Sequence, residues 1–184
     1  MSAMSDYLEN KLIDQLFRGQ SAPPTASLYV GLLTAAPSDA GGGTEVAGNG
    51  YARVSVGASL ANWSGTQGAT TTTVSSGSSG QTSNNVAITF PTPTGNWNTV
   101  THFGLYDAAT SGNLLFYGTL TIAKTINQAD TVTFPSMAST GAGEQTDTRL
   151  VAVKAVSSTY PLRGSVQLEQ SGESQTARGG PAPG

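Results

Sequence analysis

The chain has 184 residues, of which 37% are hydrophobic and only 10% charged, whereas about a quarter of an ordinary soluble domain is charged. Its net charge is −3 with scattered basic residues, so it lacks the clustered positive charge that nucleic-acid binding requires. The absence of cysteine excludes disulfides and thiolate metal sites. We expect one domain with a buried core, no signal peptide or membrane span, and a soluble protein made in the cytoplasm.

The first segment predicts an amphipathic helix over residues 4–18, ending at Gly19. Asp6 is a candidate N-cap because Glu9 follows it at the capping-box spacing, and Ser5 is an equally good candidate. Apolar residues recur every three or four positions and therefore share one face of the helix. This face either packs on its own domain or contacts a neighbouring subunit. Its candidate interface residues are Leu8, Leu12, Leu16 and Phe17.

The residues after the helix predict an all-β domain. Apolar stretches bounded by Gly- and Pro-rich turns indicate short strands, at residues 27–34, 51–56, 86–90, 100–106, 113–121 and 131–134. The segment 57–85 is rich in Ser, Thr and Gly, which is typical of an extended loop. Within VTHFGLYDAATSGNLLFYGTL, residues 100–120, a polar turn with Gly112 separates two strands. This segment predicts a β-hairpin.

Two of the predicted strands contain similar sequences. YVGLLTAA at residues 29–36 and HFGLYDAA at residues 102–109 share Gly-Leu and Ala-Ala at the same spacing. Glycine within a strand often marks a place where another backbone or an aromatic ring approaches closely. We therefore expect both strands to use their glycine in this way.

The two tryptophans of the chain, Trp63 and Trp97, lie in predicted loops. A tryptophan in a loop can make an exposed contact with a partner or a glycan, because its ring is large and amphipathic. The alternative interpretation is that each ring packs over the open end of a β-sandwich. Both residues are candidates for surface contact.

The sequence offers few groups for catalysis. His102 is the only histidine, and Asp107 is its best acid neighbour in the sequence, but positions of opposite parity on a strand point to opposite faces. No GxSxG nucleophile motif is present. The acids available for a glycosidase pair lie in predicted loops or at strand ends, and they are Asp39, Glu45, Asp107 and Asp130. We expect no catalytic residue, no metal site, no cofactor and no enzyme activity.

The composition changes after residue 134. We expect residues 1–134 to form the β domain with its helix, and residues 135–184 to contain a linker, a candidate extra strand at 149–156 and a disordered tail.

The most specific motifs of the chain are LYVGL, GYAR and THFGLYDAATSGNLL. They lie within SLYVGLLTAAPSDAGGGTEVAGNGYARVSV and NVAITFPTPTGNWNTVTHFGLYDAATSGNLLFYGTLTIAKTINQADTVTF. From about residue 5 to residue 134, the chain resembles a family of small tailed-bacteriophage virion proteins, which are often labelled tail fibre proteins. It is also similar to the capsid-cementing protein of a Bordetella phage.

The resemblance implies a jelly-roll-like β-sandwich without catalytic residues, and the predicted short strands agree with a sandwich or barrel. We expect a virion structural protein that decorates or cements the capsid by non-covalent contacts with the major capsid protein or other virion proteins. It would be a homo-oligomer located in the virion, and in the host cytoplasm before assembly. The alternative is a tail-fibre or receptor-binding module that recognises a host-surface glycan.

Overall fold

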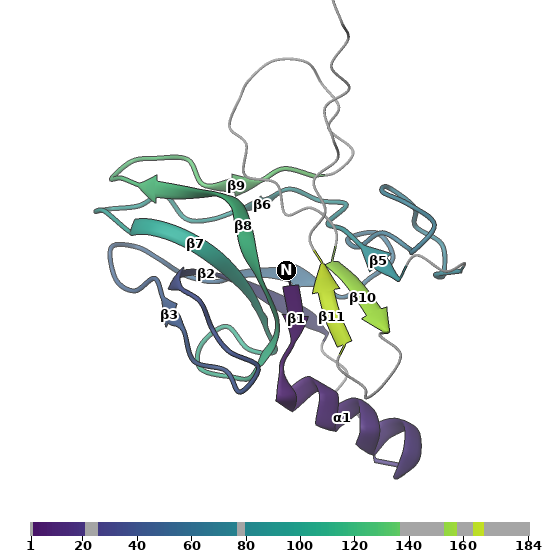
Figure 1. Ribbon diagram of the computed structural model, residues 1–184. Coiled ribbons are helices and arrows are strands. Elements are labelled where there is room, and N and C mark those ends of the chain that lie inside the picture. Colours follow the sequence, from purple (N-terminus) through teal and green to yellow (C-terminus); the bar gives the residue numbers. More distant parts are fainter. Residues whose placement is uncertain (1, 21–25, 77–79, 137–152, 158–163, 168–184) are drawn as a thin grey trace, which may run out of the picture.

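The computed structural model describes residues 2–20, 26–76, 80–136, 153–157 and 164–167 (Figure 1). These residues form one helix and a series of strands. In chain order the elements are β1 (Ser2–Met4), α1 (Asp6–Phe17), β2 (Ser27–Ala35), β3 (Thr44–Glu45), β4 (Val54–Gly57), β5 (Gln81–Thr82), β6 (Ile88–Thr89), β7 (Asn98–Tyr106), β8 (Leu114–Ile126), β9 (Thr133–Phe134), β10 (Val153–Ser157) and β11 (Gly164–Gln167).

The predicted β-hairpin is confirmed and lies at the centre of the fold. β7 and β8 pair antiparallel, and the backbone N–H of Asp107 donates to the carbonyl of Asn113 at 3.2 Å where the turn begins. Gly112 has a φ of +71° in this turn, a left-handed conformation that glycine adopts without steric cost. The short polar turn therefore fixes which residues of the two strands face each other.

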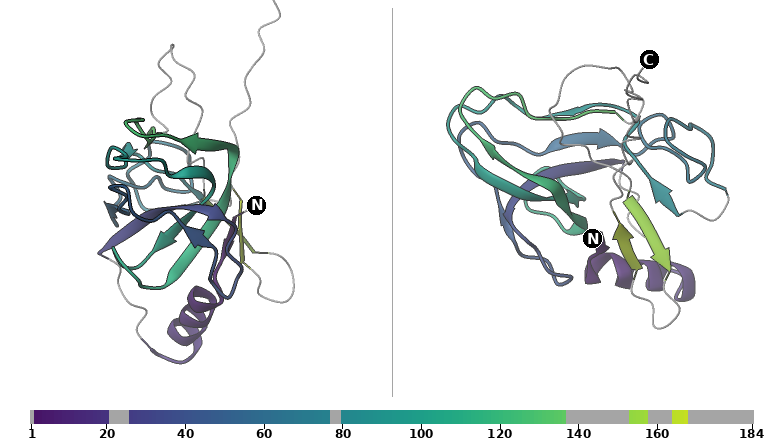
Figure 2. Two further views of the ribbon diagram at one scale, coloured as in Figure 1. Left: turned by 90° about the vertical axis from the view of Figure 1, so that its left-hand side faces the viewer. Right: turned by 45° about the horizontal axis from the view of Figure 1, so that its top comes forward.

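The strands form two sheets that enclose one core. In the larger sheet the strand order is β3-β2-β7-β8-β1-β11-β10-β5, with β4 paired to β2, and β6 and β9 form a separate two-stranded sheet. Phe134 of β9 packs against Phe103 of β7, with ring centroids 6.4 Å apart, so the two sheets face each other. Figure 2 shows α1 at the end of the domain away from β6 and β9. The all-β class is confirmed, and the jelly-roll connectivity stays a prediction.

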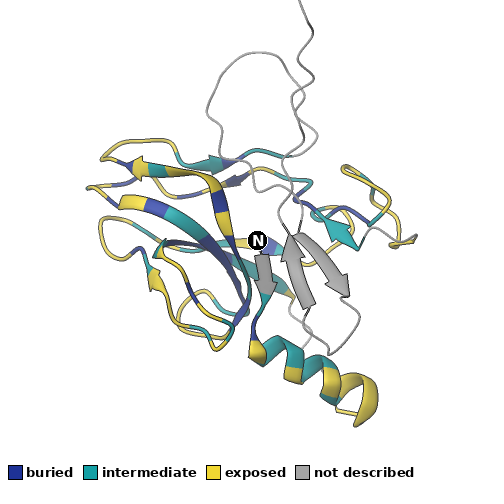
Figure 3. Cartoon of the chain, viewed as in Figure 1, coloured by how far each residue is buried: buried dark blue, intermediate teal, exposed yellow. Residues whose placement is uncertain are grey.

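The buried residues concentrate along β2, β7 and β8, where Figure 3 shows most of the dark blue. They alternate with exposed residues in parts of these strands, as expected for strands that cover a core with one face. The core also takes in residues from the second sheet and from two loops. Its buried members are Val30, Leu32, Val46, Val56, Ile88, Phe90, Trp97, Val100, Phe103, Leu105, Leu120, Ile126 and Phe134.

β8 is longer than the strand predicted at 113–121, and its register with β7 changes along its length. Val100 pairs with Lys124, whereas His102 pairs with Thr119. Residues 120–123 of β8 therefore stand opposite Thr101 alone, which is a large irregularity in the ladder. An insertion of this kind bends the strand and leaves the extra residues unpaired. The first half of β8 lies between β7 and β1 in the large sheet, and its second half turns toward β9 (Figure 1).

Other strand boundaries also differ from the predicted ones. β4 begins at Val54 rather than residue 51, and β6 is confined to Ile88–Thr89 within the predicted strand 86–90. β4 does not extend back to Tyr51 because this residue bonds to β2 through its side chain, whose hydroxyl accepts the backbone N–H of Leu32. β5 lies inside the predicted loop 57–85.

The C-terminal part of the chain is described only in two short strands. β10 (Val153–Ser157) pairs with β5 and β11 and overlaps the strand expected at 149–156. β11 (Gly164–Gln167) follows the predicted strand, and the remaining residues after Ser157, like residues 137–152 of the expected linker region, lie outside the described residues. The division of the chain at residue 134 therefore stays a prediction.

The helix predicted at residues 4–18 is observed as α1, with Ser5 as its N-cap. The hydroxyl of Ser5 accepts the backbone N–H of Leu8 at 3.3 Å and donates to the carbonyl of Leu114 on β8. One serine thus satisfies a free N–H of the helix and ties the start of α1 to the central hairpin. No helix in the described residues is both long and apolar enough to cross a membrane.

The two similar sequences of β2 and β7 lie side by side. Gly31 pairs with Gly104 across the two strands, and a Cβ on either glycine would come within 3.0 Å of Cε2 of Tyr106. The Tyr106 ring therefore covers both glycines. This confirms the expectation that both strands use glycine where an aromatic ring approaches.

Substitution of Gly104 by Ala is expected to lower the free energy of unfolding by about 1 to 3 kcal/mol, the usual cost of overpacking. The new Cβ would lie 2.8 Å from Cε2 of Tyr106 and 2.9 Å from Cδ1 of Leu114. Urea unfolding followed by tryptophan fluorescence measures the loss. The control is Gly57→Ala, where the near neighbour is the side-chain amide of Asn62 at 3.1 Å. Equal losses in the two variants would contradict the proposed role of the Tyr106 ring.

Candidate functional site

His102 and Asp107 are not brought together by the structure. His102 lies on β7 and its Nδ1 is 2.7 Å from the hydroxyl of Thr101, while burial lowers the pKa of the imidazole below its ordinary value. Asp107 lies in the hairpin turn, where its carboxylate accepts the backbone N–H of Asn113 at 2.6 Å and its side-chain amide at 2.7 Å. Five residues of extended chain separate the two positions by about 16 Å. The pair therefore forms no acid–base couple.

The other acids considered for catalysis each accept hydrogen bonds that hold loops in place. Asp39 accepts the hydroxyl of Tyr117 at 2.5 Å, and burial together with Asp39 raises the pKa of that tyrosine to about 12. Asp130 accepts the backbone N–H of Asn127 at 2.7 Å. Among the described residues, no three His, Asp or Glu side chains gather as a metal site would require.

Glu45 belongs to a polar cluster that sequence reasoning did not find, and Arg53 is at its centre. The guanidinium of Arg53 binds both carboxylate oxygens of Glu45, with Nε and Nη2 at 2.8 and 2.7 Å. Its Nη1 donates to the carbonyls of Ala108 and Ser111 at 2.9 and 2.7 Å. Arg53 thus joins the β3 segment and its own segment to the turn of the central hairpin. Its side chain is only 8% exposed, and charge-assisted forked bonds are the strongest of their class.

Two tyrosines complete this cluster. The guanidinium carbon of Arg53 lies 3.4 Å from the centroid of the Tyr106 ring, a cation–π contact. The hydroxyl of Tyr51 donates to Glu45 at 2.8 Å. Burial raises the pKa of both tyrosines above the ordinary value, and the negative charge of Glu45 adds to the rise. Both phenols therefore stay protonated at neutral pH, and Tyr51 can donate to the carboxylate.

The cluster explains the most specific motifs of the sequence. GYAR supplies Tyr51 and Arg53, LYVGL supplies Gly31, and THFGLYDAATSGNLL supplies Gly104 and Tyr106. A Cβ on Gly31 would lie 2.9 Å from a carboxylate oxygen of Glu45, so the cluster needs this glycine. The signal available in the sequence is that Arg53 is the only Lys or Arg between residues 19 and 123.

Trp97 is not a surface contact, which corrects one expectation. It is 2% exposed because the loop before β7 folds onto the loop that contains Asn49. The indole N–H of Trp97 donates to the carbonyl of Asn49 at 2.9 Å, and its ring meets Tyr51 edge-on with centroids 5.2 Å apart. Its alternative interpretation as a packing residue is therefore the one the structure bears out.

Trp63 is half-buried and packs against the core. It forms an isolated antiparallel bridge with Asn84. Its Nε1 and the Oδ1 of Asn84 are both buried without a hydrogen-bond partner. Because the residue is only partly buried, Trp63 stays a candidate for surface contact.

The apolar face of α1 is largely uncovered. None of its residues is buried. Leu8 and Leu12 are half-buried, whereas Leu16 and Phe17 are 72% and 75% exposed, with Ile13 also exposed beside them. Large apolar side chains gathered at one exposed place are typical of an interaction site. The second half of the helix therefore offers an apolar end, formed by Ile13, Leu16 and Phe17.

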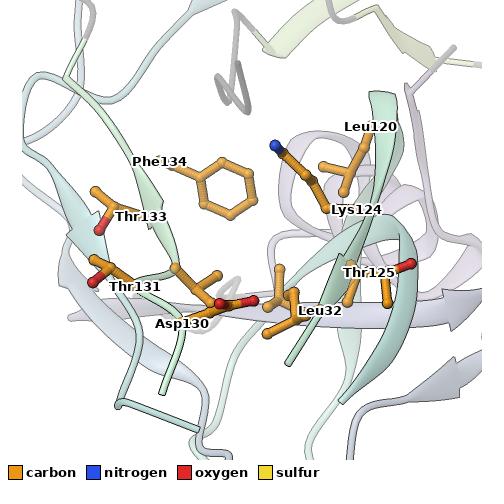
Figure 4. A pocket seen from close by; sticks show the side chains of 11 residues that line it. Leu32, Leu120, Lys124, Thr125, Asp130, Thr131, Thr133 and Phe134 are labelled. Carbon is orange, nitrogen blue, oxygen red and sulfur yellow. The ribbon is translucent and has the colours of Figure 1, made fainter. Parts of the chain in front are cut away.

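A cavity of about 540 Å³ lies between β8 and β9. Its deepest residues belong to the core, and its rim is made of charged and hydroxyl side chains from the two strands and the turn between them. Figure 4 shows the side chains of β8 and β9 on opposite sides, with the amino group of Lys124 on the side of β8. The cavity is lined by Leu32, Val100, Leu120, Lys124, Thr125, Ile126, Asp130, Thr131, Val132, Thr133 and Phe134.

The fold and its surfaces define a β-rich domain with an apolar helix end, in which the candidate acids hold loops together. Residues 3–142 match the family described as podophage GP4 fiber I protein gp80. The match covers most of the chain, so the protein belongs to this family and is a phage virion structural protein. No curated protein matches the chain.

Substitution of Arg53 by Met is expected to lower the free energy of unfolding by about 3 kcal/mol, because it removes the cation that pairs with Glu45 and the donor of two turn carbonyls. Arg18→Met is the matched control, since Arg18 forms an ion pair with Asp14 at 3.0 Å with its side chain 71% exposed. An exposed pair of this kind contributes less than about 0.5 kcal/mol. Denaturant unfolding of both variants tests the difference, and a loss from Arg53→Met no larger than that of the control would refute the central role of Arg53.

Proposed function

We propose that the protein decorates or cements the phage capsid by binding the major capsid protein through the apolar end of α1. The observation that carries this proposal is the exposure of Leu16 and Phe17 on a helix without a single buried residue. Such an end gains free energy when a partner covers it, because apolar surface is removed from water.

The start of α1 is held firmly to the sheet, so its exposed end has a defined position. The backbone N–H of Ser5 donates to the carbonyl of Leu115 at 3.0 Å, and that of Asp6 donates to the carbonyl of Asp39 at 2.8 Å. Tyr117 in turn binds the carboxylate of Asp39. A preorganised helix loses less entropy on binding than a mobile one. This anchoring supports a role of α1 in docking.

Burial of one large apolar side chain contributes about 1.5 to 3 kcal/mol, so a single helix end supports only modest affinity. On a capsid the same contact is repeated over a symmetric lattice. If copies of the protein also contact one another as a homo-oligomer, each further contact becomes intramolecular and raises the overall affinity. A small apolar site is therefore sufficient for a decorating protein.

The second candidate function is that of a fibre component or receptor-binding module that recognises a host-surface glycan. The description of the matched family as a fiber protein favours it. Of the two tryptophans considered for glycan contact, only Trp63 retains exposed surface, because Trp97 is buried. Glycan binding that is lost in Trp63→Ala would support this function over capsid decoration.

Leu16→Asp and Phe17→Asp are expected to abolish co-sedimentation of the purified protein with capsids that lack it. Both side chains are exposed, so each substitution is expected to change the free energy of unfolding by less than about 0.5 kcal/mol. Gln15→Asp adds the same charge at a neighbouring exposed position and is expected to bind normally.

Purified tails form the parallel sample in this experiment. Saturable binding to capsids that both variants lose would support capsid decoration through α1. Binding to tails alone would favour the fibre function. Normal capsid binding by both folded variants would show that the apolar end of α1 is not the interface.

A further inference from the structure

The turn that precedes Tyr51 contains Asn49 followed by Gly50, which is the only Asn-Gly pair in the chain. The backbone N–H of Tyr51 donates to the carbonyl of Gly48 at 2.9 Å, and φ is +49° at Asn49 and +77° at Gly50. Positive φ at both central positions is characteristic of a type I′ turn, for which Asn-Gly is the favoured pair. Residues 48–50 are exposed, so water reaches the turn.

The glycine makes this asparagine reactive. The backbone nitrogen of the residue after an asparagine can attack Cγ of the asparagine side chain and close a succinimide ring. A side chain on that following residue hinders the attack, and Gly50 has none. The other asparagines of the chain are followed by Lys, Trp, Asn, Val, Thr, Leu or Gln. Asn49 is therefore the asparagine with the least steric protection.

The folded turn holds the Asn49 side chain by one contact. Its Nδ2 donates a hydrogen bond of 3.0 Å to the carbonyl of Asn96 at the exposed surface. The attacking group, the backbone nitrogen of Gly50, makes no hydrogen bond within the described residues. One exposed hydrogen bond opens easily, because its net contribution to stability is small. The turn can therefore bring the two reacting atoms together without unfolding of the domain.

We propose that Asn49 is a site of spontaneous deamidation. The backbone nitrogen of Gly50 loses its proton to solvent and forms a bond to Cγ of Asn49, and the Cγ–Nδ2 bond breaks with release of ammonia. Water then opens the succinimide at either carbonyl, which gives aspartate or isoaspartate. The overall reaction consumes only water. This modification site goes beyond the proposed function and does not depend on it.

Modification of Asn49 reaches the core through the main-chain carbonyl of this residue. The carbonyl accepts the indole N–H of Trp97 and the backbone N–H of Thr94, each at 2.9 Å. In isoaspartate the main chain runs through the side chain of the residue, so the backbone becomes longer and the carbonyl is displaced. Trp97 is 2% exposed, and a buried N–H without an acceptor is unfavourable. The reaction thus loosens the loop that covers Trp97, next to Tyr51 of the Arg53 cluster.

The test is incubation of the purified full-length protein at several mildly alkaline pH values, followed by peptide mass spectrometry. The peptide that contains Asn49 is expected to gain one mass unit before the peptide of any other asparagine. The rate is expected to rise about ten-fold for each unit of pH, because the attacking nitrogen must lose a proton far below its pKa. Absence of the mass gain at Asn49, or an earlier gain at another asparagine, would overturn the proposal.

Asn49→Gly is the matched control. Glycine also suits a type I′ turn, and it has no amide group to lose, so the peptide of this variant is expected to keep its mass. A gain in the variant would assign the reaction to another residue of the peptide and refute Asn49 as the site.

The isoaspartate form of the protein, separated by chromatography, tests the effect on the core. The amides of residues 94–97 are expected to exchange with solvent about five-fold faster or more than in the unmodified protein, which corresponds to the loss of one hydrogen bond. Exchange at the same rate in both forms would overturn the inferred effect on Trp97.

Discussion

The stacking of Arg53 on Tyr106, with Glu45 bound to its guanidinium, is the interaction on which the rest of this structure depends. The guanidinium of Arg53 is a buried positive charge in a chain with few charged residues. It donates hydrogen bonds to one carboxylate and two backbone carbonyls. A buried charge without such partners would cost several kcal/mol. Because these partners come from separate segments, the cluster fixes the β3 segment, the β4 segment and the central hairpin relative to one another.

Two glycines of the large sheet make room for this cluster. Tyr106 can lie flat under Arg53 only because Gly31 and Gly104 carry no side chain. The same pairing sets the register of β2 against β7 and thereby the positions of the core residues on both strands. The hydroxyl of Ser5 in turn ties the start of α1 to β8, the second strand of the hairpin. One polar cluster thus helps to position both the core and the exposed helix.

The surfaces available for partners are of two different kinds. The end of α1 offers apolar side chains on an anchored helix, whereas the cavity between β8 and β9 combines an apolar lining with the charged side chains of Lys124 and Asp130. Docking at the helix end gains free energy because apolar side chains are removed from water. Neither surface requires a reactive group. This agrees with the structural character of the family to which the protein belongs.

The sequence by itself determined the all-β class, the single helix, the hairpin and the close approach at the paired glycines, because periodicity, turn residues and glycine placement are local signals. It gave no means of deciding which distant residues meet. The sequence therefore leaves Trp97 open between surface contact and packing, and only the fold shows that the segment containing Asn49 covers it. In the same way the sequence does not point to Arg53, because its partners lie in two other segments. The strand predicted at 113–121 is shorter than β8 because the second half of β8 pairs with β7 after a change of register. Only the tertiary structure decided these points, since burial and charge pairing depend on contacts between segments that are far apart in the chain.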